Sequence, residues 1–168
     1  EVPPLLARLL ARRHLTSDEA RDLFDAIMEG DVAPPALAAV LTALAAKGET
    51  AAEIVGAAQA MRARASRVRL PAGVAAIDTC GTGGDGRPTF NGSTTVAIVA
   101  AAAGATVAKH GNRSVTSQCG SADVLEALGM KIELGAEAVA RCLETVGIGF
   151  MFAPIFHPAM KYAAAPRR

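Results

Sequence analysis

Two loops rich in glycine, hydroxyl and amide side chains carry the chemistry that this sequence offers. The first loop spans residues 78–86 and contains four glycines, and the second spans residues 109–121. From residue 86 to residue 122 the sequence has no Asp or Glu, and its charged side chains are Arg87, Lys109 and Arg113. Backbone N–H groups at the start of a helix attract anions. Because Asp85 adds one carboxylate, the two loops together predict a site for a polyphosphate and a divalent ion.

The first loop is compatible with more than one interpretation. Gly81, Gly83 and Gly86 satisfy the G-x-G-x-x-G pattern of dinucleotide-binding proteins. That interpretation fails because residues 87–91 separate the motif from the next predicted helix, and because no acidic residue follows about 20 positions later to bind a ribose. A P-loop is excluded, since no Gly-Lys-Ser/Thr follows the glycines. The third interpretation, a turn that binds no ligand, is still possible, although such a turn would not need four glycines.

Side chains at the starts of two predicted helices could complete the anion site. Asn91, Ser93 and Thr94 lie at the start of the first of these helices, and Ser117 and Ser121 lie just before the second. Their hydroxyl and amide groups can either cap the helix or bind phosphate oxygens. For Ser121 taken alone, the two roles are equally good interpretations.

The elements that must position these loops differ between the two ends of the chain. Residues 1–65 show apolar residues at helical spacing and no strand pattern. Thr16 with Glu19, and Thr50 with Glu53, form two capping boxes, in which a hydroxyl and a carboxylate satisfy each other's backbone N–H groups. This first part is therefore expected to be a small domain of four short helices.

Beyond a linker at residues 66–73, short apolar strands alternate with helices. Strands are expected at residues 74–77, 106–108 and 148–152, and helices at residues 94–103, 122–128 and 136–146. Residues 131–133 are expected to extend briefly, and Pro158 is expected in the first turn of a last helix. Such alternation predicts an α/β domain with a parallel sheet over residues 74–168.

Composition and charge narrow the class of protein. With 168 residues the chain should form about one domain, or one small domain and part of another. A net charge of +1 with 51% hydrophobic residues argues against disorder and against a DNA-coating protein. The N-terminus lacks a signal-peptide pattern, and the longest uncharged stretch, residues 92–108, is too short to span a membrane. Three cysteines without C-x-x-C spacing favour reduced thiols, so a cytoplasmic protein without a membrane partner is expected.

An arginine cluster is the one feature that could bind nucleic acid. Four arginines lie between residues 62 and 69. No aromatic residues are interleaved with them to stack on bases, which favours a solvated helix end.

Several motifs resemble those of the anthranilate phosphoribosyltransferase family. They are Gly81-Thr82-Gly83-Gly84-Asp85, Asn91-Gly92-Ser93-Thr94, Lys109-His110-Gly111-Asn112-Arg113-Ser114, Gly120-Ser121-Ala122-Asp123-Val124-Leu125-Glu126 and residues 152–161. The resemblance covers the whole chain, including the leading helices. It implies a small helical domain followed by an α/β domain of the nucleoside phosphorylase/phosphoribosyltransferase type. It also implies transfer of a phosphoribosyl group from phosphoribosyl pyrophosphate to anthranilate, with release of pyrophosphate, in tryptophan biosynthesis.

The resemblance also implies which residues bind the substrates. Those expected to bind phosphoribosyl pyrophosphate are Gly81, Gly84, Asp85, Thr89, Asn91, Gly92, Ser93, Thr94, Lys109, His110, Gly111, Asn112, Arg113, Ser114, Val115, Thr116, Ser117 and Ser121. Those expected to meet anthranilate are Gly81, Asn112, His157 and Arg167. Ser93 would also bind Mg²⁺. No catalytic residue is assigned, and the candidates are Lys109, His110 and Arg113.

Some of these assignments have alternatives. His157 precedes Pro158, where a histidine often only caps a helix. A guanidinium such as Arg167 suits the carboxylate of anthranilate, because it can pair with both oxygens. Two positions depart from the family pattern: Gly92 replaces a bulkier apolar residue, and Gln118-Cys119 replaces a common Lys-Ser pair.

The family pattern also bears on completeness and partners. Family members continue past Arg168 and supply an Asp-Glu pair for a second magnesium ion, so the chain is expected to be an N-terminal portion with an incomplete α/β domain. The leading helices are expected to form a homodimer. Two rival functions are a pyrimidine nucleoside phosphorylase, which would need a different sequence at residues 110–113, and a non-catalytic relative that binds nucleic acid.

Overall fold

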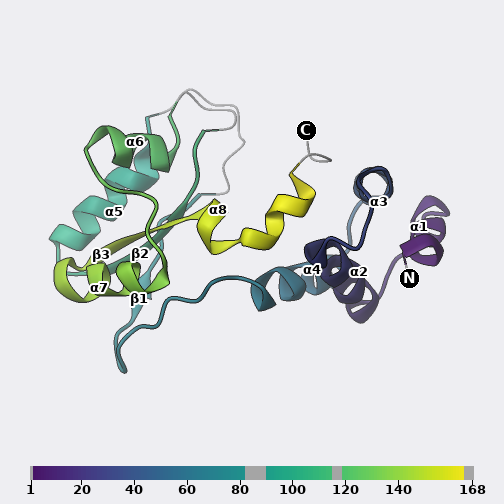
Figure 1. Ribbon diagram of the computed structural model, residues 1–168, viewed down its shortest axis with the longest axis horizontal. Coiled ribbons are helices and arrows are strands. Elements are labelled where there is room, and N and C mark those ends of the chain that lie inside the picture. Colours follow the sequence, from purple (N-terminus) through teal and green to yellow (C-terminus); the bar gives the residue numbers. More distant parts are fainter. Residues whose placement is uncertain (1, 82–89, 115–118, 165–168) are drawn as a thin grey trace. The chain divides into compact units, whose positions relative to one another are not determined.

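The computed structural model describes residues 2–81, 90–114 and 119–164. The chain forms two compact units, one made of Glu1–Ala65 with His157–Arg168 and the other of Ser66–Phe156 (Figure 1). The chain therefore leaves the first unit, builds the second, and returns to the first. Ser66 N donates a hydrogen bond of 2.9 Å to Phe156 O, so the two ends of the second unit are adjacent.

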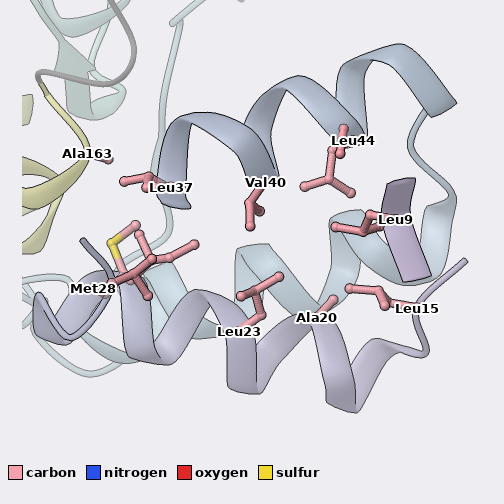
Figure 2. Close-up of a cluster of buried hydrophobic side chains, with 12 residues drawn as sticks. Leu9, Leu15, Ala20, Leu23, Met28, Leu37, Val40, Leu44 and Ala163 are labelled. Atoms are coloured by element: carbon pink, nitrogen blue, oxygen red, sulfur yellow. The ribbon is translucent and has the colours of Figure 1, made fainter. Parts of the chain in front are cut away.

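The first unit is helical, as the sequence predicts. Its elements are α1 (Val2–Leu10), α2 (Ser17–Glu29), α3 (Pro34–Lys47), α4 (Ala51–Ala63) and the 3₁₀ helix η1 (Pro158–Ala163). Their buried apolar side chains form one core, shown in Figure 2, to which α1, α2, α3 and η1 contribute Leu9, Leu23, Ile27, Leu37, Val40 and Ala163. Both predicted capping boxes are present, at the starts of α2 and α4.

The segment that contains η1 packs with the helices of the first unit, although it lies within the range 74–168 expected for the α/β domain. Ala163 is buried in the helical core, and the partly buried Ala159 and Met160 pack against it. The ring of Tyr162 covers Gly30 so closely that a Cβ there would lie 2.7 Å from it. The contact of η1 with α2 and its neighbours therefore buries Ala163.

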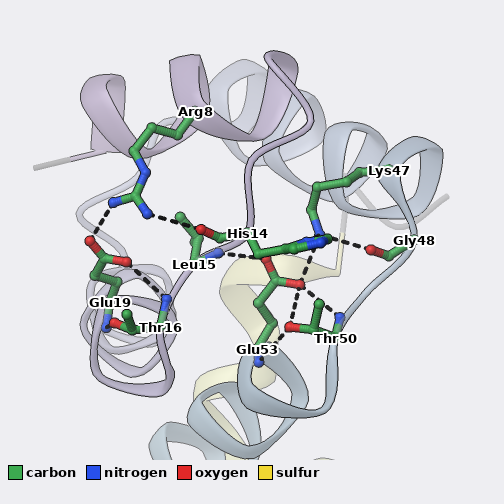
Figure 3. A network of polar contacts seen from close by, with 9 residues as sticks. All are labelled: Arg8, His14, Leu15, Thr16, Glu19, Lys47, Gly48, Thr50 and Glu53. Atoms are coloured by element: carbon green, nitrogen blue, oxygen red, sulfur yellow. Dashed lines mark hydrogen bonds and ion pairs between the residues drawn. The ribbon is translucent and has the colours of Figure 1, made fainter.

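A buried polar network joins α4 to the turns that precede α2 and α4 (Figure 3). The Glu53 side chain is 3% exposed and accepts hydrogen bonds from Leu15 N (2.9 Å), Thr50 N (2.8 Å) and Lys47 Nζ (2.9 Å). Lys47 is equally buried, and its Nζ also lies 3.0 Å from His14 Nδ1. Every oxygen of this buried carboxylate therefore has a partner, as burial of a charge requires.

Helices α2 and α4 touch through backbone at Gly56. A Cβ on this residue would lie 2.2 Å from Ser17 O and 2.7 Å from Arg21 N. Replacing Gly56 by alanine should therefore force the helices apart and lower the free energy of unfolding by about 1–3 kcal/mol. Helix propensity acts in the opposite direction, since alanine is favoured over glycine by about 1 kcal/mol.

The sign of the change therefore tests the close approach. Chemical denaturation measures the change in the free energy of unfolding. The control is Ala58→Gly, at an exposed position of α4, which should lower that free energy by about 0.5–1 kcal/mol through helix propensity alone. A Gly56→Ala variant more stable than the parent would contradict the packing of α2 on α4.

The second unit is an α/β layer. In the described part of the chain its sheet has three parallel strands in the order β1 (Ala76–Ile77), β2 (Thr106–Gly111) and β3 (Ile148–Phe152). The helices are α5 (Gly92–Ala102), α6 (Ser121–Ala127), α7 (Ala136–Val146) and α8 (Ala153–Phe156). Parallel neighbours need a crossover connection, and the helices between the strands supply it. The predicted fold class is confirmed.

Several element boundaries differ from expectation. α5 and α6 begin at Gly92 and Ser121 instead of residues 94 and 122, and each ends one residue earlier than expected. β1 begins at Ala76, two residues late, and residues 131–133 lie outside any strand. β2 continues through Gly111 because it pairs along its length with β3, with Lys109 opposite Phe150 and Gly111 opposite Phe152. Pro158 opens the 3₁₀ helix η1. Within the described residues, no helix has the length and hydropathy needed to cross a membrane.

Candidate functional site at the ends of β1 and β2

Asp78 joins the ends of two neighbouring strands. It follows β1 directly, and its Oδ1 accepts hydrogen bonds from Cys80 N (3.0 Å) and from His110 N in β2 (3.3 Å). The carboxylate therefore ties the start of the glycine-rich loop to the neighbouring strand. Sequence reasoning gave this residue no role, although an acidic residue directly after a strand of a parallel sheet is a signal for a site at that edge.

Lys109 lies on β2 and is 1% exposed. Its Nζ donates a hydrogen bond of 3.3 Å to Ser93 Oγ, at the start of α5. Burial lowers the pKa of Lys109 below its ordinary value of 10.5, and the charge of Asp78 partly opposes that effect. Among the described residues the one hydrogen bond of this buried ammonium is to a neutral hydroxyl, so the group is well suited to pair with an anion.

The start of α5 is organised by Asn91. Its side-chain oxygen accepts from Thr94 N (3.0 Å) and from Ser93 Oγ (3.2 Å), and its amide nitrogen donates to Cys119 O (3.1 Å). Thr79 Oγ1 donates to Ser93 O (2.8 Å), which connects the first loop to the same helix end. The Thr94 hydroxyl is buried and has no hydrogen-bond partner among the described residues. A buried polar atom of this kind is a candidate contact for a bound ligand or water.

Arg113 pairs with two carboxylates of α6. Its guanidinium forms hydrogen bonds to both oxygens of Glu126 (2.7 and 3.1 Å) and to Asp123 (3.3 Å), and it lies 5.8 Å from the centre of the Phe152 ring. The hydrogen bond with Glu126 is the largest cause of a raised pKa at Arg113. In the described part of the chain the Arg113 side chain thus pairs with carboxylates of α6, and its expected role at the anion site stays a prediction from the sequence.

Most of the predicted site residues that the structure describes belong to one unit. The second unit contains Gly81, Asn91, Gly92, Ser93, Thr94, Lys109, His110, Gly111, Asn112, Arg113, Ser114 and Ser121. His157 belongs to the helical unit instead, where it is the N-cap residue of η1 without a side-chain cap hydrogen bond. Outside the described residues lie Gly84, Asp85, Thr89, Val115, Thr116, Ser117, Gln118 and Arg167.

Ser121 does not cap α6. The N-cap residue is Gly120, whose N–H is bound by the side chain of Asp123, and Ser121 is a buried residue of the first helical turn. The interpretation of Ser121 as a simple cap is therefore wrong.

The donor set near Lys109 fits a magnesium ion that is held mainly by its substrate. Among the described residues, no group of three or more His, Cys, Asp or Glu side chains could hold a metal. Ser93 offers one hard oxygen at the start of α5. Mg²⁺ commonly takes one or two protein oxygens and completes its shell with substrate phosphates and water. A single hydroxyl at a phosphate site agrees with that mode of binding.

Models of two domains of one family match the chain. Residues 3–65 match "Glycosyl transferase family, helical bundle domain", and residues 73–168 match "Glycosyl transferase family, a/b domain". The fold and the two matches define the class, and the chain belongs to this glycosyl transferase family.

Within that class, several relatives carry the name anthranilate phosphoribosyltransferase. The anthranilate phosphoribosyltransferase of Chloroflexus aggregans is 61% identical over 97% of this chain and 47% of its own length, and that of Moorella thermoacetica is 58% identical over 97% and 48%. The chain thus spans about half the length of the curated relatives it matches.

Solved structures agree with these relatives. The anthranilate phosphoribosyltransferase of Thermus thermophilus has a TM-score of 0.88 and 44% identity, covering 96% of this chain and 49% of that protein. The enzyme of Saccharomyces cerevisiae in complex with PRPP and Mg also has a TM-score of 0.88, with 30% identity over 99% of this chain and 50% of that protein.

Proposed function

We propose that the protein transfers the 5-phosphoribosyl group of phosphoribosyl pyrophosphate to the amine of anthranilate, a step of tryptophan biosynthesis. The observation that carries this proposal is the buried ammonium of Lys109 beside the start of α5, where the Thr94 hydroxyl has no partner among the described residues. A cation, a helix N-terminus and an unsatisfied hydroxyl together suit a diphosphate. Relatives solved with PRPP and Mg and with 4-fluoroanthranilate support the choice of substrates.

In this reaction the bond between C1 of the ribose and the pyrophosphate oxygen breaks, and its electron pair leaves with pyrophosphate. The anthranilate nitrogen forms the new C1–N bond and releases a proton to solvent. Lys109 and the N–H groups at the start of α5 stabilise the negative charge that grows on pyrophosphate. The aromatic amine is a weak base and is already unprotonated near neutral pH, so positioning of the two substrates supplies much of the acceleration.

In this proposal a magnesium ion would bind the diphosphate of the substrate. Ser93 would hold it from the protein side, and when bound it would neutralise part of the charge of the departing group. Phosphoribosyl pyrophosphate would be bound by Gly81, Asn91, Gly92, Ser93, Thr94, Lys109, His110, Gly111, Asn112, Arg113, Ser114 and Ser121 among the described residues, and anthranilate by Gly81, Asn112 and His157. Asp85 and Arg167, outside the described residues, stay predictions from the sequence.

A homodimer through the helical unit is a further part of this proposal. Two apolar side chains of α4, Ile54 and Val55, are 59% and 48% exposed. Ile54 also lines a cavity of about 280 Å³ together with apolar side chains of α2 and α3. A second copy would remove this surface from water in the cytoplasm. Sedimentation equilibrium measures the association.

The proposed reaction is tested by the loss of anthranilate fluorescence. The assay uses the longest product of the reading frame with phosphoribosyl pyrophosphate and Mg²⁺, and phosphate with thymidine serves as the control for a nucleoside phosphorylase. We expect the fluorescence to fall only when all three components are present. A protein that leaves the anthranilate signal unchanged, but splits thymidine, would refute the proposal.

A further inference from the structure

Asp123 connects two backbone segments that carry candidate substrate contacts. It lies in the first turn of α6, and its Oδ2 accepts hydrogen bonds from Ser114 N (2.9 Å) and Gly120 N (2.8 Å). Ser114 follows β2, and Gly120 precedes α6. One carboxylate oxygen therefore joins the chain after the strand to the chain before the helix.

The same two segments touch through their backbones. A Cβ on Gly120 would lie 2.3 Å from Ser114 N and 2.7 Å from Asn112 O, so only glycine fits here. Ala122 N donates a hydrogen bond of 3.2 Å to Asn112 O and closes the contact from the helix side. Across this close approach the Asp123 carboxylate accepts from both N–H groups.

The charge of Asp123 strengthens this connection. The N–H groups of Ser114 and Gly120 are the main causes of the lowered pKa of Asp123, so the side chain is a carboxylate at neutral pH. Hydrogen bonds to an ionised acceptor are roughly twice as strong as those between neutral groups. Arg113 donates to the other oxygen, Oδ1 (3.3 Å), and is itself held by Glu126.

We propose that Asp123 is a positioning residue for phosphoribosyl pyrophosphate, because it holds Asn112 and Ser114 against Gly120 and Ser121 before the substrate arrives. The inference rests on the proposed function, to which it adds a residue that touches neither substrate. Groups that are already ordered lose less entropy when a ligand binds, so the expected benefit is affinity for phosphoribosyl pyrophosphate. Loss of a supporting hydrogen bond of this kind commonly costs about 10–100-fold in affinity.

The test compares Asp123→Ala with Glu126→Ala in the full protein. Both variants remove a carboxylate partner of Arg113 from α6, but only the first removes the acceptor of Ser114 N and Gly120 N. In Asp123→Ala we expect the KM for phosphoribosyl pyrophosphate to rise about 10-fold or more, with a smaller change in kcat. In Glu126→Ala the same KM should stay within about 2-fold of the parent. Asp123→Asn keeps an acceptor oxygen without the charge and should give an intermediate KM.

Amide hydrogen exchange provides a readout that does not depend on activity. Exchange at Ser114 and Gly120 should accelerate about 10-fold or more in Asp123→Ala and stay unchanged in Glu126→Ala. If Asp123→Ala does not fold, Asp123→Asn carries both measurements.

Failure of this inference can be told apart from failure of the proposed function. If the parent protein transfers no phosphoribosyl group, the proposed reaction is wrong, and with it the substrate that Asp123 is said to position. If the parent is active while Asp123→Ala or Asp123→Asn keeps the parental KM, or loses only kcat and thermal stability, Asp123 has a merely structural role and the inference is overturned.

Discussion

Replacing Lys109 by methionine is expected to reduce phosphoribosyl transfer by at least about 100-fold while making the α/β unit more stable. The loss follows because Lys109 supplies a buried ammonium beside the start of α5, and removal of one such electrostatic group typically costs about 10²–10³-fold in rate. Stability should rise because a methionine of similar length removes a buried charge whose one hydrogen bond among the described residues is to a neutral hydroxyl.

The pH dependence of stability provides a second signature of Lys109. Its pKa in the folded protein is lowered, mainly by burial, so the unfolded chain binds the proton more tightly. Stability of the parent should therefore rise as the pH increases from the lowered pKa towards 10.5, whereas the Lys109→Met variant should lack this rise.

Steady-state kinetics and denaturation with urea measure the two effects of Lys109→Met. The exposed Lys131 supplies the control, because Lys131→Met removes a lysine of the same unit without changing a buried charge. If the Lys109→Met protein keeps the activity of the parent, Lys109 is not part of the proposed site.

Replacing Glu53 by glutamine is expected to lower the free energy of unfolding of the helical unit by about 3 kcal/mol at neutral pH. Burial alone would raise the pKa of Glu53. The hydrogen bonds from Leu15 N, Lys47 and Thr50 outweigh that effect and lower the pKa to about 2. The substitution also leaves the buried ammonium of Lys47 without its carboxylate, and breaking a buried ion pair in this way is strongly destabilising.

The same pKa sets the acid sensitivity of the helical unit. Because the pKa of Glu53 is lower in the folded state, its contribution is complete above the ordinary value of 4.5 and is lost as the pH falls towards 2. The parent and Glu53→Gln should therefore approach one another in stability at about pH 2, as followed by circular dichroism during denaturation. The exposed Glu49 offers a control, since Glu49→Gln should change stability by no more than about 0.5 kcal/mol. A gap between parent and Glu53→Gln that stays constant down to pH 2 would contradict the role of the carboxylate.

Elements with local signals could be predicted from the sequence. Each capping box consists of residues three positions apart, and both are present at the predicted helix starts. The helix Ala136–Val146 and the strand Ile148–Phe152 have the predicted bounds, because an amphipathic repeat and a continuous apolar run mark them.

Roles that depend on tertiary contacts could not be predicted. Glu53 was expected only to cap its own helix, but it also accepts from Leu15 N, 38 residues away in sequence. The residue at which β2 ends depends on its pairing with β3, and the sequence of β2 alone does not predict that pairing. Arg113 was grouped with the phosphate-binding cations because its loop lacks acids, whereas the structure pairs it with carboxylates that lie on the following helix.

The substrate contacts themselves remain predictions. Lys109, Ser93 and Asn91 lie together as the two-loop interpretation requires. That arrangement could be anticipated, since parallel strands place the loops at their carboxyl ends along one edge of the sheet. The burial of Lys109 could not, because a lysine at that position is equally compatible with a solvated side chain.

The return of the chain to the helical unit after Phe156 has a consequence for the order of synthesis. On the ribosome the four leading helices emerge first, but η1 follows only after residues 66–156 have been translated. Until then the nascent helical core lacks Ala163, and Gly30 lacks the ring of Tyr162. Domains generally fold in order as they emerge, and incompletely covered apolar surface attracts chaperones. The core of the helical unit therefore gains η1 only after the intervening 66–156 segment has been made.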